Sequence, residues 1–110
     1  MKDDRLYLIH INECIHRIEE YLGDGGKVAF MASSLIQDAI IRNLQILTES
    51  AIRISDELQG KYPAVEWFKI RGFRNVLVHA YLGVDLEMIW NIIERDLPKL
   101  KAAVEKMLTD

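Results

Sequence analysis

Apolar residues recur every three or four positions along most of this chain, and this spacing constrains the fold more than any other feature. Such a period places them on one face of an α-helix, whereas a half-buried strand would alternate at every second residue. The clearest stripes are Leu8, Ile11, Ile15, Ile18 and Leu22; Ile36, Ile40, Leu44, Leu47, Ala51, Ile54 and Leu58; and Ile89, Ile93, Leu97, Leu100, Val104 and Met107. Because each stripe needs a neighbouring surface to cover it, we expect a bundle of helices.

The chain has few breaks, namely "GDGG" at 23–26, "GKYP" at 60–63 and "LGVD" at 82–85. Gly60 suits the end of the second helix, and Pro63 suits the first turn of the third. Asp85 is a good N-cap for the last helix. Pro98 lies inside that helix, where it removes a hydrogen bond and crowds the preceding turn, so we expect a kink near Pro98. The prediction is an all-α, antiparallel bundle of four to five helices.

Length and composition favour one globular domain covering residues 1–110. The chain has 110 residues, of which 50% are hydrophobic and 28% charged, as in ordinary folded proteins. No apolar run approaches the roughly 18 residues that cross a bilayer, and "MKDDRLYL" does not read as a signal peptide. Cys14 is the only cysteine, so no internal disulfide forms, and we expect a cytoplasmic location with Cys14 as a small buried residue.

Charge is distributed unevenly along the chain. The formal net charge is −3, which argues against broad, charge-driven binding of nucleic acid. Residues 61–81 nevertheless carry Lys61, Lys69, Arg71 and Arg74 against Glu66 alone. This segment is therefore locally positive, and it suits a local anion site on an acidic protein.

The stretch "RNVLVHAY" at 74–81 divides into two faces if residues 64–81 form a helix. Ile70, Phe73 and Leu77 fall on one side, which we expect to be core. Arg71, Arg74, Asn75 and His79 gather on the opposite side. Val78 is apolar and lies among these polar residues. We interpret it as a sign that a second copy of the chain covers this face, which predicts a homodimer.

Arginine and histidine together can cleave RNA without a metal ion. An imidazole accepts or donates a proton near neutral pH, and a guanidinium holds phosphate and stabilises its negative charge in the transition state. RNA supplies its own nucleophile, the 2′-hydroxyl. We expect no cofactor and no metal, since His16 does not share the face of His10 and Cys14.

Four further polar residues have two interpretations each. Asn75 either orients the imidazole or is an ordinary surface amide. Arg71 either binds a second phosphate or is a solvated charge. Glu49 and Asp38 on the long helix either pair with arginine or face water, and neither is expected to be catalytic.

The same stretch resembles a known family. "RNVLVHAY" fits the R-x4-6-H pattern of HEPN domains, and more narrowly the R-x4-H-x-Y pattern of HepT-like toxins. "LIQDAIIRNLQILTESA" is similar to the long second helix of that family and "VDLEMIWNIIERDLPKL" to its C-terminal stretch, so the resemblance covers residues 4–108. The chain departs from the family at Thr48, Glu49 and Ser50, where Gly-Glu-Ala is common. That change puts close helix packing at Thr48 in question.

The resemblance implies an all-α, homodimeric ribonuclease toxin of a type VII toxin–antitoxin system, partnered by a minimal nucleotidyltransferase antitoxin. It assigns RNA cleavage to Arg74 and His79, and it makes Tyr81 the residue to which the antitoxin transfers AMP. The alternative is a non-catalytic HEPN module that binds a nucleotidyltransferase, which the acidic net charge and small size motivate.

Overall fold

The described part of the chain folds into helices joined by short turns, so the predicted all-α class is confirmed. The computed structural model describes the backbone of residues 2–81 and 85–110, and the side chains of residues 3–79 and 85–110. Its elements are α1 (Lys2–Leu22), α2 (Gly26–Ala32), α3 (Ser34–Ile52), α4 (Asp56–Lys61), α5 (Trp67–Tyr81), α6 (Leu86–Asn91), the π-helical segment η1 (Ile92–Asp96) and α7 (Leu97–Thr109). No described helix is both long enough and apolar enough to cross a membrane.

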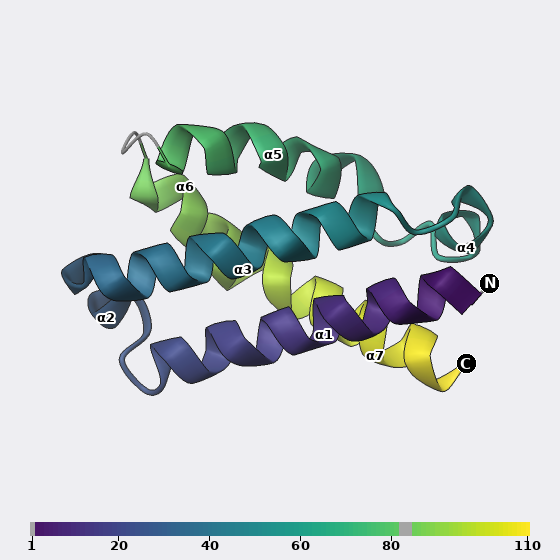
Figure 1. Cartoon of the computed structure of the whole chain (residues 1–110), viewed down its shortest axis with the longest axis horizontal. Coiled ribbons are helices and arrows are strands. Elements are labelled where there is room, and N and C mark those ends of the chain that lie inside the picture. Colours follow the sequence, from purple (N-terminus) through teal and green to yellow (C-terminus); the bar gives the residue numbers. More distant parts are fainter. Residues whose placement is uncertain (1, 82–84) are drawn as a thin grey trace.

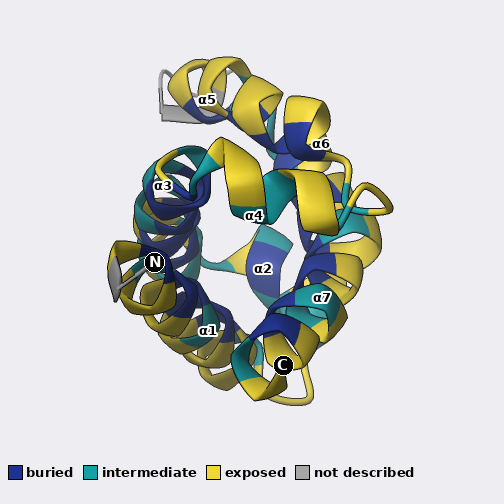
Figure 2. Cartoon of the chain, turned by 90° about the vertical axis from the view of Figure 1, so that its right-hand side faces the viewer, coloured by how far each residue is buried: buried dark blue, intermediate teal, exposed yellow. Residues whose placement is uncertain are grey.

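Helix α3 lies between α1 and α5 and runs antiparallel to both (Figure 1). The C-terminal segment starts with α6 beside α5 and ends with α7 beside α1, so it crosses the bundle behind α3. This arrangement leaves α5 at one edge of the molecule, where only one of its sides is covered (Figure 2).

The apolar stripes seen in the sequence form the core. The end view shows the buried parts of α1, α3 and α7 turned inward around a common interior (Figure 2). The most deeply buried side chains come from α1, α2, α3, α6 and α7, and include Phe30, Ile11, Ile15, Ile18, Ile40, Leu44, Leu47, Ile89 and Val104. Cys14 is also buried, as predicted.

Helix α2 closes one end of the bundle, although the sequence patterns did not predict it as a separate helix. Phe30 is fully buried and packs on Trp90 of α6, with ring centroids 5.8 Å apart. The Gln37 side chain of α3 donates to the Phe30 carbonyl at 2.9 Å. The break before α2 contains Gly23, whose φ of +52° is a conformation that glycine adopts without strain.

The prediction that the second helix continues to Gly60 is wrong. α3 ends at Ile52, and Gly60 lies within the separate short helix α4. The cause is Ser55, whose side chain caps α4 by accepting a hydrogen bond from the Leu58 N–H at 3.2 Å. Asp4 fixes Ser55 in this position, because its carboxylate accepts from the Ser55 N–H at 2.8 Å and from the Ser55 hydroxyl at 2.6 Å.

The third helix begins later than Pro63 suggested. It starts at Trp67, and residues 62–66 form a turn in place of the expected first helical residues. The Trp67 indole N–H donates to the carbonyls of Gln59 and Tyr62, at 3.2 and 3.1 Å. These two bonds close the connection between α4 and α5, so Trp67 anchors the start of α5 in the core.

The expected disruption near Pro98 takes the form of a π-helical segment directly before it. In η1 the Leu97 N–H bonds to the Ile92 carbonyl, five residues earlier. Pro98 has no N–H for the Glu94 carbonyl and its ring crowds that group, so the preceding turn widens. Asp85 caps α6 as predicted, since its side chain accepts from the Met88 N–H at 3.2 Å.

Replacing Asp4 with alanine is expected to lower the free energy of unfolding by about 2 kcal/mol, because a buried charged acceptor of two hydrogen bonds is lost. Urea denaturation followed by far-UV circular dichroism measures this loss. Asp3→Ala is the control: it removes an exposed carboxylate from the same helical turn and is expected to change the value by less than about 0.5 kcal/mol. Equal stability of the two variants would contradict a structural role for the Asp4–Ser55 contact.

Candidate functional site

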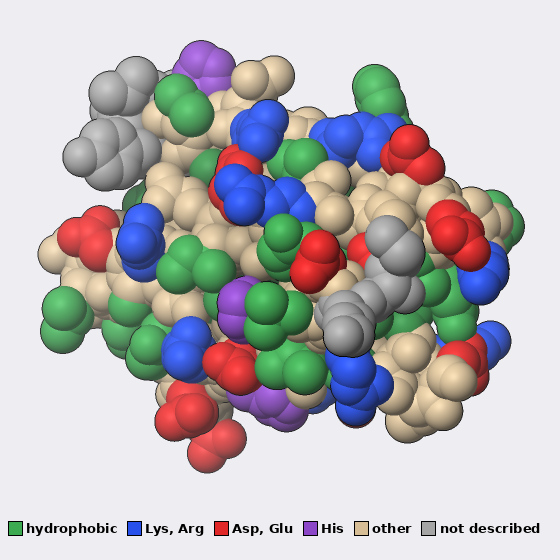
Figure 3. Space-filling model, turned by 45° about the vertical axis from the view of Figure 1, so that its right-hand side comes forward, with side chains coloured by type: hydrophobic (Ala, Val, Ile, Leu, Met, Phe, Trp, Pro, Cys, Tyr) green, Lys and Arg blue, Asp and Glu red, His purple; other side chains and the backbone are tan. Residues whose placement is uncertain are grey.

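Helix α5 has one covered face and one open face, as the sequence predicted. Ile70, Phe73 and Leu77 are buried. The polar residues of the opposite face, namely Arg71, Arg74, Asn75 and His79, are all exposed. Val78 is 57% exposed in the single chain, so a hydrophobic side chain faces solvent among these polar groups. Basic side chains gather over α5 and the adjoining part of α3 in the space-filling view (Figure 3).

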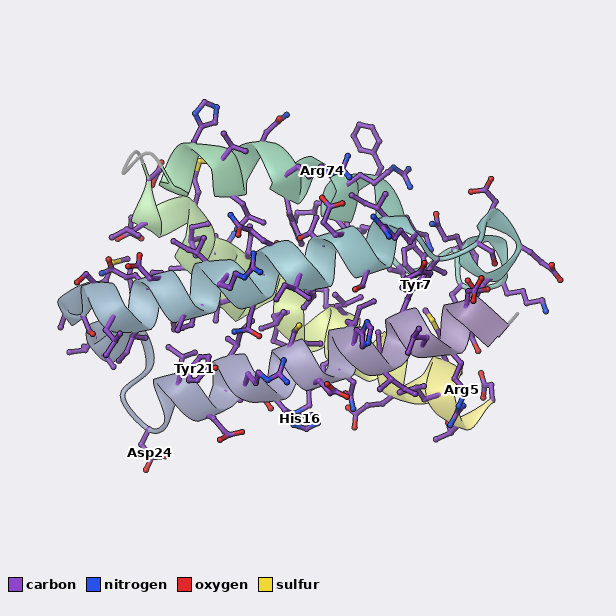
Figure 4. All side chains as sticks on the ribbon, viewed as in Figure 1. Arg5, Tyr7, His16, Tyr21, Asp24 and Arg74 are labelled. Atoms are coloured by element: carbon purple, nitrogen blue, oxygen red, sulfur yellow. The ribbon has the colours of Figure 1, made fainter. Side chains whose placement is uncertain are left out.

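Arg74 lies at the edge of the open face of α5 that is nearest to α3, where Glu49 holds it (Figure 4). Its Nε donates to Glu49 Oε1 at 2.8 Å, and its Nη2 donates to Glu49 Oε2 at 2.7 Å. The sequence left open whether Glu49 pairs with an arginine or faces water, and the structure shows the pair. Two parallel bonds of this kind fix the plane of the guanidinium as well as its position.

The ion pair shifts the pKa of each of its two groups in the direction that keeps that group charged. The hydrogen bonds from Arg74 hold the pKa of Glu49 below its usual value, in spite of partial desolvation that acts the other way. The same bonds raise the pKa of Arg74. Glu49 uses only one edge of the guanidinium, which leaves the N–H groups of Nη1 for an external anion.

A groove runs beside this pair, between α3 and α5. Gln45, Thr48 and Glu49 line it from α3, and Arg74, Leu77 and Val78 line it from α5. Its volume is about 310 Å³. Thr48 is buried, so the bulkier residue that stands here in place of glycine still fits between the helices, but its hydroxyl has no hydrogen-bond partner among the described residues. The sequence patterns did not identify Gln45 or Thr48 as parts of a site, because only the pairing of α3 with α5 brings them beside Arg74.

The other candidate residues are distributed around α5. Arg71 is exposed and donates to the Gln59 side chain at 3.3 Å, which links α5 to α4. Asn75 and His79 are exposed. His79 follows Arg74 by five residues, which places the two about 140° apart around the helix and about 7.5 Å apart along it. The side chain of Tyr81, the predicted modification site, lies outside the described residues.

No group of three or more His, Cys, Asp or Glu side chains lies close enough to hold a metal ion in the described part of the chain. The polar groups that the structure brings together beside the groove are a guanidinium, a carboxylate and an amide.

Comparison with known proteins identifies relatives of the whole domain. The family whose sequence model matches residues 11–107 is described as "Ribonuclease HepT-like". A protein of Methanocaldococcus jannaschii named "Gamma-glutamylcyclotransferase and putative RNase" is 37% identical over 109 residues, which are 99% of this chain and 49% of that protein. The chain thus spans about half the length of this relative. No solved structure matches the chain significantly.

Other relatives match this chain over nearly their full length. The "Probable ribonuclease HepT" of Thermococcus cleftensis is 34% identical over 101 residues, covering 92% of each chain. The "mRNA nuclease HepT" of Shewanella oneidensis is 23% identical over 119 residues, covering 86% of this chain and 88% of that protein. The match to the family covers most of the fold, including α5 and the groove. The chain therefore belongs to the HepT-like ribonuclease family.

Proposed function

We propose that this protein is a metal-independent RNA endonuclease in which Arg74 and His79 carry the reaction. The observation behind this proposal is the guanidinium that Glu49 fixes at the edge of an open groove, on the same helix as an exposed histidine. Membership in a ribonuclease family, and relatives named ribonuclease or mRNA nuclease, support RNA as the substrate.

The reaction uses the 2′-hydroxyl of the substrate as the nucleophile. His79 removes the proton of that hydroxyl, and the 2′ oxygen attacks the adjacent phosphorus. The bond from phosphorus to the 5′ oxygen of the next nucleotide breaks, which leaves a 2′,3′-cyclic phosphate and a 5′-hydroxyl. An imidazolium donates the proton that the leaving oxygen needs, and Arg74 stabilises the extra negative charge on the phosphorane through its free N–H groups.

A complete site requires two copies of the chain in this proposal. Arg74 faces α3, whereas His79 lies about 140° further around α5, so the two side chains of one chain do not converge on one phosphate. A second copy that covers the open face of α5 would bring its own His79 towards Arg74 and would bury Val78. This homodimer would remove the 57% exposed apolar side chain of Val78 from water, which favours association.

The proposal extends to regulation through the family resemblance. The protein acts as the toxin of a type VII toxin–antitoxin system, and a minimal nucleotidyltransferase antitoxin neutralises it by transferring AMP to Tyr81. The phenol oxygen bonds to the α-phosphorus of ATP, pyrophosphate leaves, and the phenol proton goes to solvent. Tyr81 follows Arg74 by seven residues on α5, which is about two turns along the same side of the helix, so a bulky anionic adduct there would exclude the RNA phosphate by sterics and like charge.

Replacing His79 with alanine is expected to lower the rate of RNA cleavage in EDTA by about 10²- to 10⁴-fold, because the proton transfer is lost. Arg74→Ala is expected to lower it by about 10²- to 10³-fold, because the phosphorane loses its charged donor. A gel assay with end-labelled RNA measures both rates. His10→Ala is the control, since it removes another exposed histidine on α1. Equal cleavage by the parent and His79→Ala would refute the nuclease and favour the non-catalytic module that binds a nucleotidyltransferase.

Mixing the two inactive variants tests the shared site. Half of the re-formed dimers contain one chain of each kind, and each mixed dimer then has one site with an intact Arg74 and an intact His79 from opposite chains. Activity is therefore expected to recover to roughly a quarter of the parent value. The same RNA gel assay, after a denaturation and refolding cycle, measures the recovery. No recovery from a mixture that is shown to form mixed dimers would mean that each chain carries its own site.

Mass spectrometry after incubation with the partner nucleotidyltransferase and ATP is expected to show a gain of one or more AMP units on Tyr81, together with loss of RNA cleavage. Tyr81→Phe is expected to abolish the gain, because the acceptor oxygen is absent. Tyr21→Phe, at an exposed tyrosine on α1, is the control and should leave the gain unchanged. A full mass gain on the Tyr81→Phe variant would refute the assignment of this residue.

A further inference from the structure

The antiparallel packing of α3 and α5 sets which residues lie level with each other across the groove. Glu49 bonds to Arg74, and Gln45 lines the same groove as Val78. Each step of four residues along α3 is thus matched by a step of four in the opposite direction along α5. Continuing this register, Arg53, directly after the end of α3, lies level with Ile70 and one residue from Arg71, and Arg42 lies level with Tyr81 in the last turn of α5.

Arg42 and Arg53 occupy the same face of α3 as Glu49. The positions 42, 45, 49 and 53 follow each other at three- and four-residue steps, so their side chains form one stripe along the helix. Both arginines are exposed, and neither has a salt-bridge partner among the described side chains. Arg53 is close enough to Glu49 to lower the pKa of that carboxyl, after the larger effect of Arg74.

The two helices together form a positive strip on a protein of net charge −3. Arg42, Arg53, Arg71 and Arg74 surround Glu49, and α5 contains no acidic residue. On α3 the next acid is Asp38, one turn before Arg42, where the strip ends. Figure 3 shows several Lys and Arg side chains over this part of the surface, with acidic groups between and beside them.

We propose that Arg42 and Arg53 bind the phosphates of a single-stranded RNA on either side of the phosphate held by Arg74, so that the strand follows the groove between α3 and α5. The 11 residues from Arg42 to Arg53 span about 16 Å of helix, which accommodates up to about five stacked nucleotides. An unpaired base meets the Gln45 amide beside the groove. Such contacts require a base that is free of a duplex partner.

This inference rests on the proposed function for the identity of the ligand, and it adds residues outside the R-x4-H-x-Y motif. The binding measurement uses His79→Ala as the background, so that RNA is bound without being cut. A fluorescent single-stranded RNA of about 12 nucleotides is titrated in EDTA at several salt concentrations, with fluorescence anisotropy as the readout. Circular dichroism of each variant checks that the helices are retained.

Arg42→Gln and Arg53→Gln are each expected to weaken binding at low salt by about 5- to 10-fold, and to reduce the slope of log affinity against log salt by about 0.7 for each lost phosphate contact. The double variant is expected to lose about twice that slope. Arg17→Gln is the matched control, because it removes an exposed arginine from α1 and should leave affinity and slope unchanged. Parent-like affinity and slope in both groove variants would overturn the proposal.

Three further outcomes separate this inference from binding of an acidic protein and from the proposed nuclease activity. A polyglutamate peptide of equal charge is the competing ligand. If it binds the parent more tightly than RNA does, and loses more affinity in the variants, the strip is a surface for an acidic protein and the proposed binding of RNA is overturned. If RNA binds through Arg42 and Arg53 but the parent never cleaves it, the proposed nuclease activity is refuted, and the proposed binding of RNA along the groove is retained. If the parent cleaves RNA but neither arginine substitution changes the affinity for RNA, only the proposed binding of RNA by Arg42 and Arg53 is refuted.

Discussion

The packing of α3 between α1 and α5 is the constraint on which the rest of the structure depends. The buried stripe of α3 needs cover on two sides, and α1 supplies one side while α5 supplies the other. Once α5 lies antiparallel to α3, the register of the groove is determined, since Ile70, Phe73 and Leu77 must face inward. Glu49 then meets Arg74, and every other polar residue beside the groove takes its place from that contact.

The position of α5 at the edge of the bundle explains how a helix can serve both core and site. Its inner face contributes to stability, whereas its outer face has no neighbour among the residues that the structure describes (Figure 2). Packing in the core does not constrain the residues on an uncovered face, so these residues can serve in binding. The exposed pair of Glu49 and Arg74 adds little to stability in such a setting. Its physical effect is to restrict a long, flexible arginine to one orientation, because two parallel hydrogen bonds fix the plane of the guanidinium.

The sequence predicted the features that depend on local periodicity, and it missed those that depend on contacts distant along the chain. The division of α5 into two faces and the cap at Asp85 follow from spacing alone, and both are confirmed. The end of α3 at Ile52 depends on Asp4, which is 51 residues from Ser55, so no local pattern reports it. The sequence did not determine the partner of Arg74 for the same reason, because Glu49 is 25 residues away and lies on a different helix.

The local charge at the groove resolves the apparent conflict between an acidic protein and a polyanionic substrate. Screening limits the reach of a charge in solution to about 8 to 10 Å, so a phosphate in the groove responds mainly to the side chains around it. There Arg74 is fixed by Glu49, and Arg53 and Arg71 each lie about one helical turn away along the chain from Glu49 and Arg74, respectively. The remaining acidic residues, spread over the other helices, oppose non-specific attachment elsewhere on the surface. A net charge of −3 is therefore compatible with RNA binding that is confined to one groove.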